Sequence, residues 1–507
     1  MIPVISLSRS QVRSLEIKDY ILCILSAILL IFAFSSFNLW LLAWFGFVPL
    51  LLALQDKKPL PAFLLSCITG IIFWWGTIYW LIHVTLLGQV ILILYLTLYF
   101  GIFGLAVSVM RNTPGAARLL AIPSLWVLLE YVRAHLFTGF PWAILGYSQY
   151  RNLPVVQIAD ITGAWGVSFL VMMVNVAIYS PWRLRKRNKL AVVCLVFVLA
   201  YGFYKIIPLP INKEQAPLKV SVIQGNIAQK LKWDKETRGL ILNKYFNLTA
   251  QAAKGKPGLI IWPEAALPVV LEEEPGYYER VSSFTQKINT PLLLGAVTKK
   301  DKLYYNSAIL IAAAGQTLTQ YNKLHLVPFG EYIPLKRALP FLETIVPIGD
   351  ITAGKEYIIF ETPNSKPQTP NYFAVLICFE DLFPGLSRKF VQKGARFLVN
   401  ITNDAWYKKT SAPYQHLMAS VFRAIENRVF LMRSANTGVS GFIAPTGKIV
   451  SLVQDKYKRN IFIDGYDSQE LIFPKKKNFS FYTRYGDVFI LFCLALFLYG
   501  ILSLLEK

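Results

Sequence analysis

Long apolar runs and one long mixed region alternate along the chain. Each apolar run is close to the ~20 residues that an α-helix needs to cross the hydrocarbon core of a membrane. We therefore expect eight transmembrane helices, at about 20–37, 39–54, 61–82, 89–110, 119–137, 155–179, 190–207 and 488–505. A cleaved signal peptide is the alternative for the first run, but that run is long, no clear cleavage site closes it, and a second apolar run follows almost at once.

The mixed region, about 210–485, contains short apolar stretches that end in polar turns. The stretches 218–226, 258–264 and 373–381 are typical of buried strands, and 237–254 is typical of a helix. Strands that alternate with helices favour an α/β layer fold. We therefore divide the chain into a domain of seven transmembrane helices at 1–209, an α/β domain at 210–485, and a last transmembrane helix with a short tail at 486–507.

The composition agrees with a membrane protein. Hydrophobic residues make up 55% of the chain and charged residues 16%, against about 25% charged in a typical soluble protein. The formal net charge of +23 could indicate nucleic-acid binding. However, the basic residues lie mostly in loops beside apolar runs and no nucleic-acid motif is present, so we assign the charge to contact with anionic lipid headgroups.

The distribution of basic residues between the short loops predicts the orientation. Loops after the second, fourth and sixth runs carry Lys57, Lys58, Arg111, Arg118 and the basic cluster 183–189, whereas loops after the first and third runs carry none. The positive-inside rule then places both termini in the cytoplasm and the 210–485 region outside. Arg133 and Arg151, near the outer end of the fifth run, count weakly against this orientation.

Cys378 is the one cysteine of five that lies in the mixed region, so this region cannot form an internal disulfide. It ends the apolar stretch 373–377, and a thiol at the end of a buried strand is held rigidly where α/β folds place their chemistry. The alternative is a small hydrophobic residue that merely ends a strand. The sequence has no CxxC pair, no metal-ligand spacing among its histidines and no glycine-rich nucleotide loop, so we expect no metal or other cofactor.

Glu264 and Lys323 also stand at abrupt boundaries of strands or loops. They are far from Cys378 in the chain, so only the fold could bring the three together. A carboxylate can take the proton of a thiol, and a lysine can stabilise both the thiolate and the oxyanion that forms when the sulfur attacks a carbonyl. Each residue alone could be a capping glutamate, a surface lysine or a core cysteine, but the sequence around them favours a catalytic trio.

The motifs that contain these residues resemble those of the nitrilase, or carbon–nitrogen hydrolase, superfamily. They occur in the order Ile261–Glu264, Tyr321–Lys323, Leu326–Pro334 and Ile377–Glu380. Further motifs resemble those of one family within it, the apolipoprotein N-acyltransferases: Gln224–Asn226, Lys232–Trp233, Asn403–Trp406, Arg423–Arg428, Ala435–Ser440, Phe137–Trp142 and Leu145–Gln149. The resemblance covers nearly the whole chain, and the position of the polar domain before the last apolar run also matches that family.

The resemblance implies an α-β-β-α sandwich with a Glu-Lys-Cys triad. Cys378 would hold an acyl chain as a thioester, Glu264 would act as general base and acid, and Lys323 would stabilise the tetrahedral intermediates. Glu331 and Glu380 match acidic positions that support the triad. The resemblance further implies substrate contacts for Trp233, Asn306, Phe379, Trp406, Tyr407 and Glu426.

The family transfers a fatty acyl chain from a membrane phospholipid, usually phosphatidylethanolamine, to the α-amine of the diacylglyceryl-cysteine that begins a lipoprotein. The resemblance therefore implies a multi-pass protein of the bacterial inner membrane, with its catalytic domain on the periplasmic side and ping-pong kinetics. No self-association motif stands out, so we expect a monomer.

Two other functions fit parts of the sequence. A membrane-tethered amidase could use the same triad with water as acceptor, since the triad alone cannot choose between amine and water. A transporter would instead need paired charges or broken helices at mid-depth. Glu130 and Asp160 are the main acids in the apolar runs, but both lie near run ends, where we expect local partners such as Arg133 or backbone groups.

Overall fold

The computed structural model describes residues 14–34, 36–180, 189–207, 217–332, 351–362, 371–473 and 478–505. The chain forms two compact units. The first, here called the helical unit, comprises 1–149, 164–200 and 487–507; the second, the α/β unit, comprises 150–163 and 201–486. The predicted boundary at 209/210 and residues 183–188 of the basic cluster lie outside the described residues.

The helical unit contains some of the long helices that the apolar runs predict. It contains α1 (Ile17–Ala33), η1 (Trp40–Trp44), α2 (Val48–Ala53), α3 (Pro59–Thr77), η2 (Tyr79–His83), α4 (Leu86–Val109), η3 (Met110–Asn112), α5 (Gly115–His135), η4 (Leu145–Gln149), α8 (Ala164–Tyr179), the first part of α9 (Lys189–Ile206) and α16 (Val488–Leu505). Among the described residues four helices are long and apolar enough to cross a membrane, namely those that contain α3, α4, α5 and α9. The other four predicted runs form shorter or broken helices, so the prediction of eight spanning helices is supported for four of them.

The second predicted run is broken at Gly46, between η1 and α2. A break in an apolar environment leaves backbone groups that must find other partners. The hydroxyl of Ser26 donates to the carbonyl of Gly46 at 2.6 Å. The side chain of Asn175, in α8, accepts from the N–H of Phe47 and donates to the carbonyl of Ala43, both at 2.8 Å. Two polar side chains from other helices therefore complete the hydrogen bonds that the break opens.

The sixth predicted run, 155–179, is also divided. Gly163, with φ of +65°, separates the short helices α6 (Leu153–Val156) and α7 (Ala159–Thr162) from α8. Residues 150–163 pack with the α/β unit, and only α8 belongs to the helical unit. Asp160 illustrates the difference: it pairs with Arg428 at 2.8 Å, a residue of the α/β unit, and not with the local partner that we expected. Glu130, by contrast, accepts from the backbone N–H of Leu145, as expected for a local partner.

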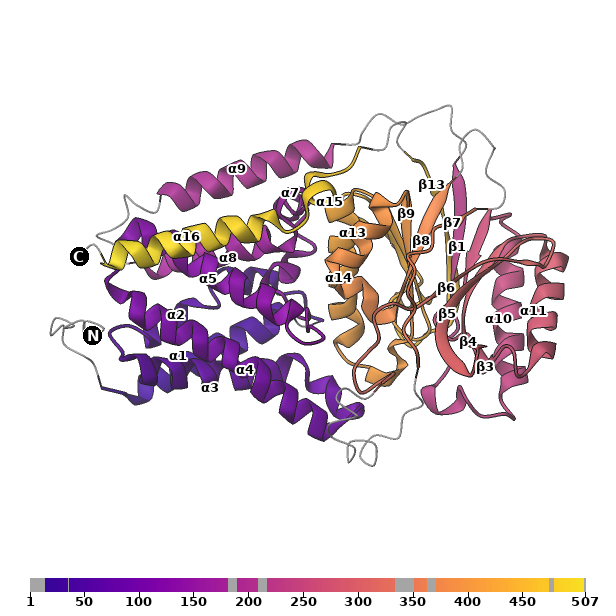
Figure 1. The fold of residues 1–507 in the computed structure, drawn as a ribbon, viewed down its shortest axis with the longest axis horizontal. Coiled ribbons are helices and arrows are strands. Elements are labelled where there is room, and N and C mark those ends of the chain that lie inside the picture. The colour runs from indigo at the N-terminus through magenta and orange to yellow at the C-terminus, as the bar shows by residue number, and fades with distance from the viewer. Residues whose placement is uncertain are drawn as a thin grey trace. The chain divides into compact units, whose positions relative to one another are not determined.

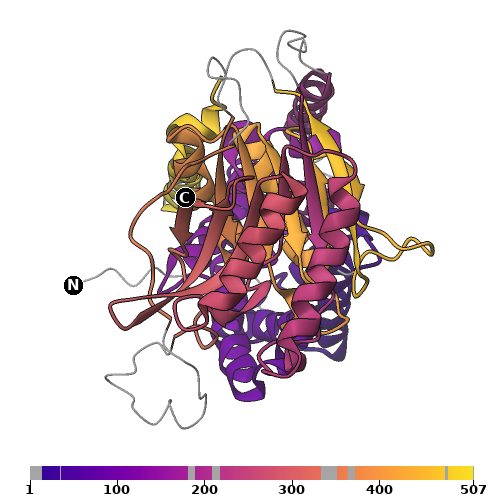
Figure 2. The same cartoon turned by 90° about the vertical axis from the view of Figure 1, so that its right-hand side faces the viewer.

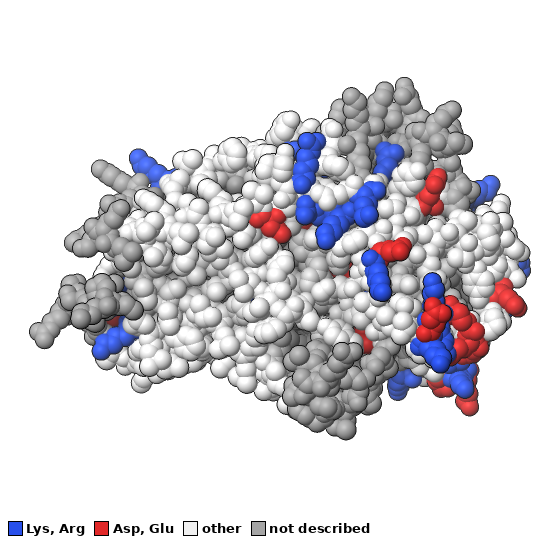
Figure 3. All heavy atoms as spheres, in the orientation of Figure 1, with Lys and Arg blue, Asp and Glu red and all other residues white. Residues whose placement is uncertain are grey.

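The surface of the helical unit agrees with burial in lipid. On the face drawn in Figure 3 it is largely free of charged side chains. Large apolar residues such as Leu94 and Leu491 are more than half exposed on its helices. Lys57, one of the residues that predicted the orientation, is buried against Asp19 and is not a surface charge.

The α/β unit contains two sheets. The first has the order β13-β1-β2-β4-β5-β6, with β3 paired to β4, and the second has the order β12-β11-β10-β9-β8-β7. Their strands are β1 (Leu218–Gln224), β2 (Leu259–Ile261), β3 (Leu267–Val270), β4 (Leu292–Lys300), β5 (Leu303–Ile311), β6 (Thr317–Asn322), β7 (Phe360–Glu361), β8 (Tyr372–Ile377), β9 (Phe397–Thr402), β10 (Phe430–Ala435), β11 (Gly441–Ile443), β12 (Ile449–Leu452) and β13 (Gly465–Leu471). Strands β8, β9 and β10 are parallel, as are β1, β2 and β4, so their carboxyl ends gather along common edges.

Helices cover the outer faces of both sheets. The helices and short helical turns of this unit are α6, α7, the end of α9, η6 (Gln229–Leu231), α10 (Arg238–Ala253), α11 (Pro275–Ile288), η7 (Cys378–Leu382), α13 (Pro384–Gln392), η8 (Asp404–Tyr407), α14 (Ala412–Asn427) and α15 (Phe481–Tyr485). In Figure 1, α10 and α11 lie outside the first sheet, and α13 and α14 lie outside the second; Figure 2 shows α10 and α11 in front of the sheets. The order helix, sheet, sheet, helix is the four-layer sandwich that the resemblance implies.

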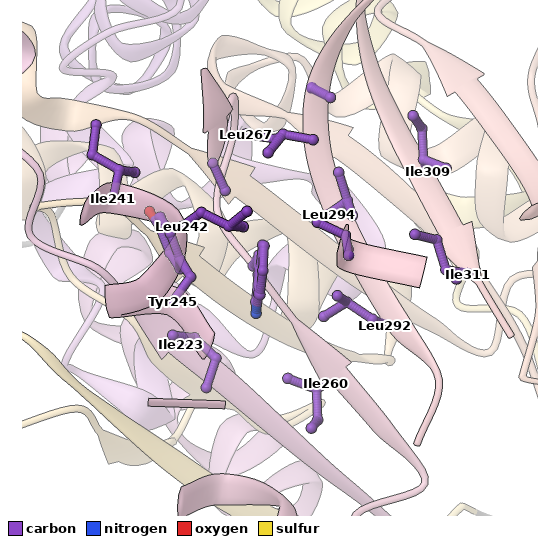
Figure 4. Packing of buried hydrophobic residues seen from close by; sticks show 14 of the residues in the cluster. Ile223, Ile241, Leu242, Tyr245, Ile260, Leu267, Leu292, Leu294, Ile309 and Ile311 are labelled. Carbon is purple, nitrogen blue, oxygen red and sulfur yellow. The ribbon is translucent and has the colours of Figure 1, made fainter. Parts of the chain in front are cut away.

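An apolar core joins the first sheet to α10. Ile241, Leu242 and Tyr245 of α10 face Ile260 and Leu294 of the sheet (Figure 4). The ring of Tyr245 stacks on that of Trp262 with centroids 4.9 Å apart, and the indole N–H of Trp262 donates to Thr249 at 2.8 Å. Trp262 lies two residues before Glu264, so this core fixes the backbone from which that carboxylate projects.

Candidate active site

Cys378 directly follows the last residue of β8 and has a left-handed backbone, with φ of +53°. This conformation costs a residue with a side chain roughly 1–2 kcal/mol. Two side chains bond the carbonyl of Cys378 and so hold it there: Asn400 donates at 3.1 Å, and Nε2 of His416 lies 3.3 Å away.

Glu264 and Lys323 lie next to each other in the structure. Glu264 follows β2, Lys323 follows β6, and their side chains approach to 3.7 Å between Nζ and Oε1. Both side chains are buried, at 1% exposure for Lys323 and 10% for Glu264. The charges of both act on the thiol of Cys378, so the fold brings the three predicted residues together.

Asn306 and Glu331 complete the surroundings of these two charges. Nδ2 of Asn306, in β5, donates to Oε1 of Glu264 and to Oε1 of Glu331, both at 2.8 Å. Glu331 contacts Nζ of Lys323 at 2.8 Å and accepts from the N–H of Val327 at 2.8 Å. Asn306, which the resemblance assigns to substrate, thus bridges two carboxylates and positions Glu264.

Glu380 links the turn after Cys378 to the turn after β6. One of its oxygens accepts from Tyr321 and Leu324, both at 2.7 Å, and from His325 at 3.1 Å. The other accepts from the N–H of Ile377 at 2.7 Å. Burial raises the pKa of Glu380 to about 7, although these donors and Lys323 oppose the rise. Glu380 therefore joins the segment that begins with Cys378 to the segment that follows Lys323.

The electrostatics of the trio favour proton transfer within it. Burial raises the pKa of the Cys378 thiol, the Glu264 carboxylate raises it further, and Lys323 lowers it, with a net value well above the ordinary one. Burial alone would lower the pKa of Lys323, but Glu331 and Glu264 outweigh it and raise this pKa. The thiol is thus protonated at rest beside a carboxylate, and the lysine remains a cation.

The predicted substrate-contacting aromatics divide into exposed and buried residues. The side chains of Trp233 and Trp406 are 45% and 50% exposed, which is unusual for indole rings. Phe379 is buried and packs edge-on against Phe383 at 5.2 Å. Burial raises the pKa of the Tyr407 hydroxyl, and the charges of Cys378 and Glu264 raise it further, so Tyr407 lies beside the trio.

Glu426 does not join this group. It is fully buried in α14, and its Oε1 accepts from Arg423 at 2.9 Å. Arg423 in turn donates to the carbonyl of Leu382 at 3.1 Å. The expectation that Glu426 contacts substrate is therefore not supported: its carboxylate neutralises a buried arginine.

A charged network around His416 contacts the backbone of Cys378 and was not predicted from the sequence. Nδ1 of His416 lies 3.0 Å from Asp404 and Nε2 lies 2.8 Å from Asp381, and Arg433 donates to Asp381 at 2.8 Å. Burial alone would lower the pKa of His416, but the two aspartates raise it to about 9. His416 is therefore a cation, and it contacts the backbone carbonyl of Cys378. The motif that contains Asp404 was recognised, but the histidine has no local signal because its partners come from other elements.

Lys232 was also missed as a site residue, although it belongs to a motif that carries the resemblance. It is buried, and its Nζ donates to the backbone carbonyl of Glu264 at 3.0 Å. Within the part of the chain that the structure describes, no group of three or more His, Cys, Asp or Glu residues is arranged to hold a metal ion.

The four-layer sandwich and the Glu, Lys and Cys at its strand ends define a protein of the carbon–nitrogen hydrolase class. Residues 219–471 match the family described as carbon–nitrogen hydrolase, and residues 26–177 match the family described as apolipoprotein N-acyltransferase N-terminal domain. Proteins named apolipoprotein N-acyltransferase from Geobacter metallireducens and Chlorobaculum tepidum are 40% and 29% identical to this chain. The alignments cover 94% of this chain and of the first relative, and 98% of this chain and of the second. The chain therefore belongs to the apolipoprotein N-acyltransferase family, as its motifs predict.

Among solved structures, an amidase from Nesterenkonia sp. AN1 is 16% identical, with a TM-score of 0.39. The match covers 52% of this chain and 94% of the amidase.

Proposed function

We propose that the protein transfers a fatty acyl chain from a membrane phospholipid to the α-amino group of the diacylglyceryl-cysteine at the start of lipoproteins, through a thioester on Cys378. The observation that carries the proposal is the meeting of Glu264, Lys323 and Cys378 from three distant strand ends. Membership of the apolipoprotein N-acyltransferase family supports this choice of acceptor.

In the first half-reaction the sulfur of Cys378 attacks the ester carbonyl of the phospholipid while Glu264 takes the thiol proton. The raised pKa of the thiol supports a proton transfer that accompanies attack, because no free thiolate exists beforehand. Lys323, with the backbone N–H of Phe379, stabilises the oxyanion. The intermediate collapses, the carbon–oxygen bond breaks, and Glu264 returns the proton to the leaving alcohol of the lysophospholipid.

In the second half-reaction the neutral α-amine attacks the thioester carbonyl. The carbon–nitrogen bond forms, the carbon–sulfur bond breaks, and Glu264 carries a proton from nitrogen to sulfur. Both substrates use one nucleophile in turn, so the kinetics are ping-pong. Trp233 and Trp406 are half exposed, and we assign them to contact with the acyl chains, since large apolar surfaces attract lipid.

The location follows from the same chemistry. Both substrates remain in a bilayer, so an enzyme with spanning helices finds them by lateral diffusion. We assign the protein to the bacterial inner membrane, with the α/β unit on the periplasmic side. We assign the phospholipid donor to the phosphatidylethanolamine class and the active form to a monomer.

The intact mass of the purified protein after incubation with phosphatidylethanolamine tests the thioester. We expect the wild-type protein to gain one acyl chain that hydroxylamine removes, and Cys378→Ser to gain none and to lose at least about 10³-fold in activity. Cys194→Ser, a change in a thiol of α9 outside the site, should still gain the chain. A wild-type protein without adduct even after rapid quenching would contradict the mechanism.

A second measurement separates transfer from hydrolysis. Labelled phospholipid and a diacylglyceryl lipopeptide are incubated together, and we expect the label on the amine of the peptide. Release of free fatty acid without N-acylated peptide would instead identify an amidase-like enzyme that uses water. Full function in Cys378→Ala would contradict both enzymatic readings.

A further inference from the structure

Lys232 is a second lysine beside the triad. Lys232 is 2% exposed, and its Nζ donates to the backbone carbonyl of Glu264 at 3.0 Å. It also lies within electrostatic range of the Cys378 side chain. Lys323 approaches the carboxylate of Glu264, whereas Lys232 contacts the backbone of the same residue, so the two lysines occupy different positions around the general base.

The loop that carries Lys232 is fastened to the second sheet by amide side chains. Asn436, which follows β10, accepts from the N–H of Ile227 at 2.8 Å and donates to its carbonyl at 2.7 Å. It also donates to Asn403 at 2.9 Å, and Asn403 donates to Gln229 at 2.8 Å. Gln229 begins η6, the turn that ends immediately before Lys232. The position of Lys232 is therefore fixed by bonds between the two sheets.

Lys232 can accept a proton without losing its hydrogen bond. Within the described residues, Nζ has one acceptor, the carbonyl of Glu264. A neutral amine has two N–H groups and a lone pair, so it can donate to this carbonyl and still accept a proton. The other bases near the trio are more fully engaged: Glu331 contacts three donors, and Glu380 accepts from four.

Transfer to an amine involves one proton more than Glu264 handles. An α-amino group has a pKa of about 7.7–8.0, so at neutral pH the acceptor arrives mostly as an ammonium ion. It must lose one proton before it attacks and a second as the carbon–nitrogen bond forms. Glu264 carries the second proton to the sulfur, so a base other than Glu264, in the site or in the solvent, takes the first.

The pKa of Lys232 suits this task. Burial lowers it to about 8, close to that of the acceptor amine, while the negative charge on Glu264 opposes the shift. A neutral fraction of Lys232 is therefore present at neutral pH, beside the general base.

We propose that Lys232 is a further catalytic residue, which accepts the ammonium proton of the lipoprotein acceptor in the acyl-enzyme. In this step R–NH₃⁺ and the neutral Lys232 amine become R–NH₂ and the Lys232 ammonium, and Lys232 later releases the proton to water. The inference rests on the proposed acyl transfer, because a hydrolase that uses water has no ammonium proton to remove.

The test compares two nucleophiles on the same acyl-enzyme. The full-length enzyme is loaded with phospholipid, separated from the excess, and discharged with a diacylglyceryl lipopeptide or with hydroxylamine, which is uncharged at neutral pH. In Lys232→Arg the cation remains but cannot act as a base, because guanidinium does not lose its proton in proteins. Lys230→Arg changes an exposed lysine of the same turn and is the matched control.

At pH 7 we expect Lys232→Arg to lose about 100-fold in discharge by the lipopeptide relative to discharge by hydroxylamine. At pH 9.5, where the acceptor amine is already neutral, this relative loss should fall below about tenfold. Lys230→Arg should match the wild type with both nucleophiles. Lys232→Met, which has a similar length and no base, should repeat the pattern of Lys232→Arg.

Several results would overturn the inference. Lys232 would have a structural role, or a role in the first half-reaction, if both nucleophiles were slowed equally or if the deficit were unchanged at pH 9.5. The same conclusion would follow if neither Lys232 variant formed acyl-enzyme. A wild-type enzyme that never acquires a hydroxylamine-labile chain would overturn the proposed function itself. A wild-type enzyme that loads normally beside an unimpaired Lys232→Arg would overturn only the role of Lys232.

Discussion

The amide nitrogen of Asn306 donates to two carboxylates, so an amide is required at this position. Replacement by Asp would remove the donor to Glu264 and Glu331 and add a third negative charge beside them. We expect Asn306→Asp to lower kcat about 100-fold with little change in KM, because the base is mispositioned rather than the substrate. Asn322→Asp is the matched control, since Oδ1 of Asn322 already accepts from Ser307 and Gln320 and an acid preserves both bonds. Equal losses in the two variants would contradict this role for Asn306.

His416 predicts a pH dependence of stability. Its pKa in the folded protein is raised to about 9 by Asp381 and Asp404, against a lowering by burial and by Arg433. Its unfolded pKa is about 6.5, so its contribution is fully present below pH 6.5 and is lost as the pH rises through 9. We expect a loss of roughly 2–3 kcal/mol across this range, measured by thermal unfolding in detergent.

In His416→Gln this part of the pH dependence should be absent. His135→Gln, at an exposed histidine, should keep the wild-type dependence. An identical pH dependence in His416→Gln and the wild type would show that the imidazole does not carry the charge.

At the scale of single residues, the sequence predicted the triad because its members stand in recognisable motifs. Neither His416 nor Lys232 could be assigned a role in this way. The loop of Lys232 is placed by amides that follow β9 and β10, which are distant in sequence, and Glu426 pairs with Arg423 inside one motif. Local sequence predicted the reactive groups, while the contacts of the groups that surround them depend on the tertiary structure.

Among the elements, the break between η1 and α2 depends on a side chain from another helix. Asn175→Leu would leave the N–H of Phe47 and the carbonyl of Ala43 without their partner in an apolar environment. We expect the free energy of unfolding to fall by about 2–5 kcal/mol, since each buried unsatisfied group costs about 1–3 kcal/mol. Ser503→Ala, which removes an exposed bond to the carbonyl of Tyr499, should change it by less than about 0.5 kcal/mol. A stability of Asn175→Leu within that same margin would contradict this account of the break.

The predicted elements were most accurate where the pattern was regular. The helix expected at 237–254 is α10, and the strands expected at 218–226 and 373–381 overlap β1 and β8, the latter ending at Ile377. The second and sixth apolar runs were wrong as single helices, because hydropathy does not report a break. The polar groups at the break of the second run are completed by Ser26 and Asn175, and the sixth run is divided at Gly163. Hydrophobicity thus predicted the positions of the apolar segments, but it did not predict how these segments are divided into helices.

Arg428 joins segment 150–163 to the rest of the α/β unit. It donates to Asp160 at 2.9 Å and to Oε1 of Gln157 at 2.6 Å, and Tyr201 at the end of α9 donates to Asp160 at 2.6 Å. We expect Arg428→Met to accelerate amide hydrogen exchange in residues 150–163 about 100-fold, because the buried carboxylate of Asp160 would lose its closest cation and Gln157 would lose a hydrogen bond. Arg459→Met, in an exposed pair with Asp455, should leave this exchange unchanged. Unaltered exchange in Arg428→Met would contradict the anchoring role.

For the whole molecule, the sequence predicted a membrane part and a four-layer α/β sandwich. The assignment of residues 150–163 could not be predicted, because their composition is apolar and their partners Arg428 and Thr446 lie far along the chain. Apolar character alone does not distinguish a segment that packs on protein from one that packs on lipid.

This arrangement sets an order of events during biosynthesis. Residues 150–163 leave the ribosome before β1 exists, and Arg428 follows only after most of the sandwich has been made. The segment therefore cannot pair with Arg428 until the ribosome has synthesised most of the polar domain. A polar region synthesised alone from residue 210 onward would keep Arg428 and lose Asp160, the acid that pairs with it, so the α/β unit extends beyond that region.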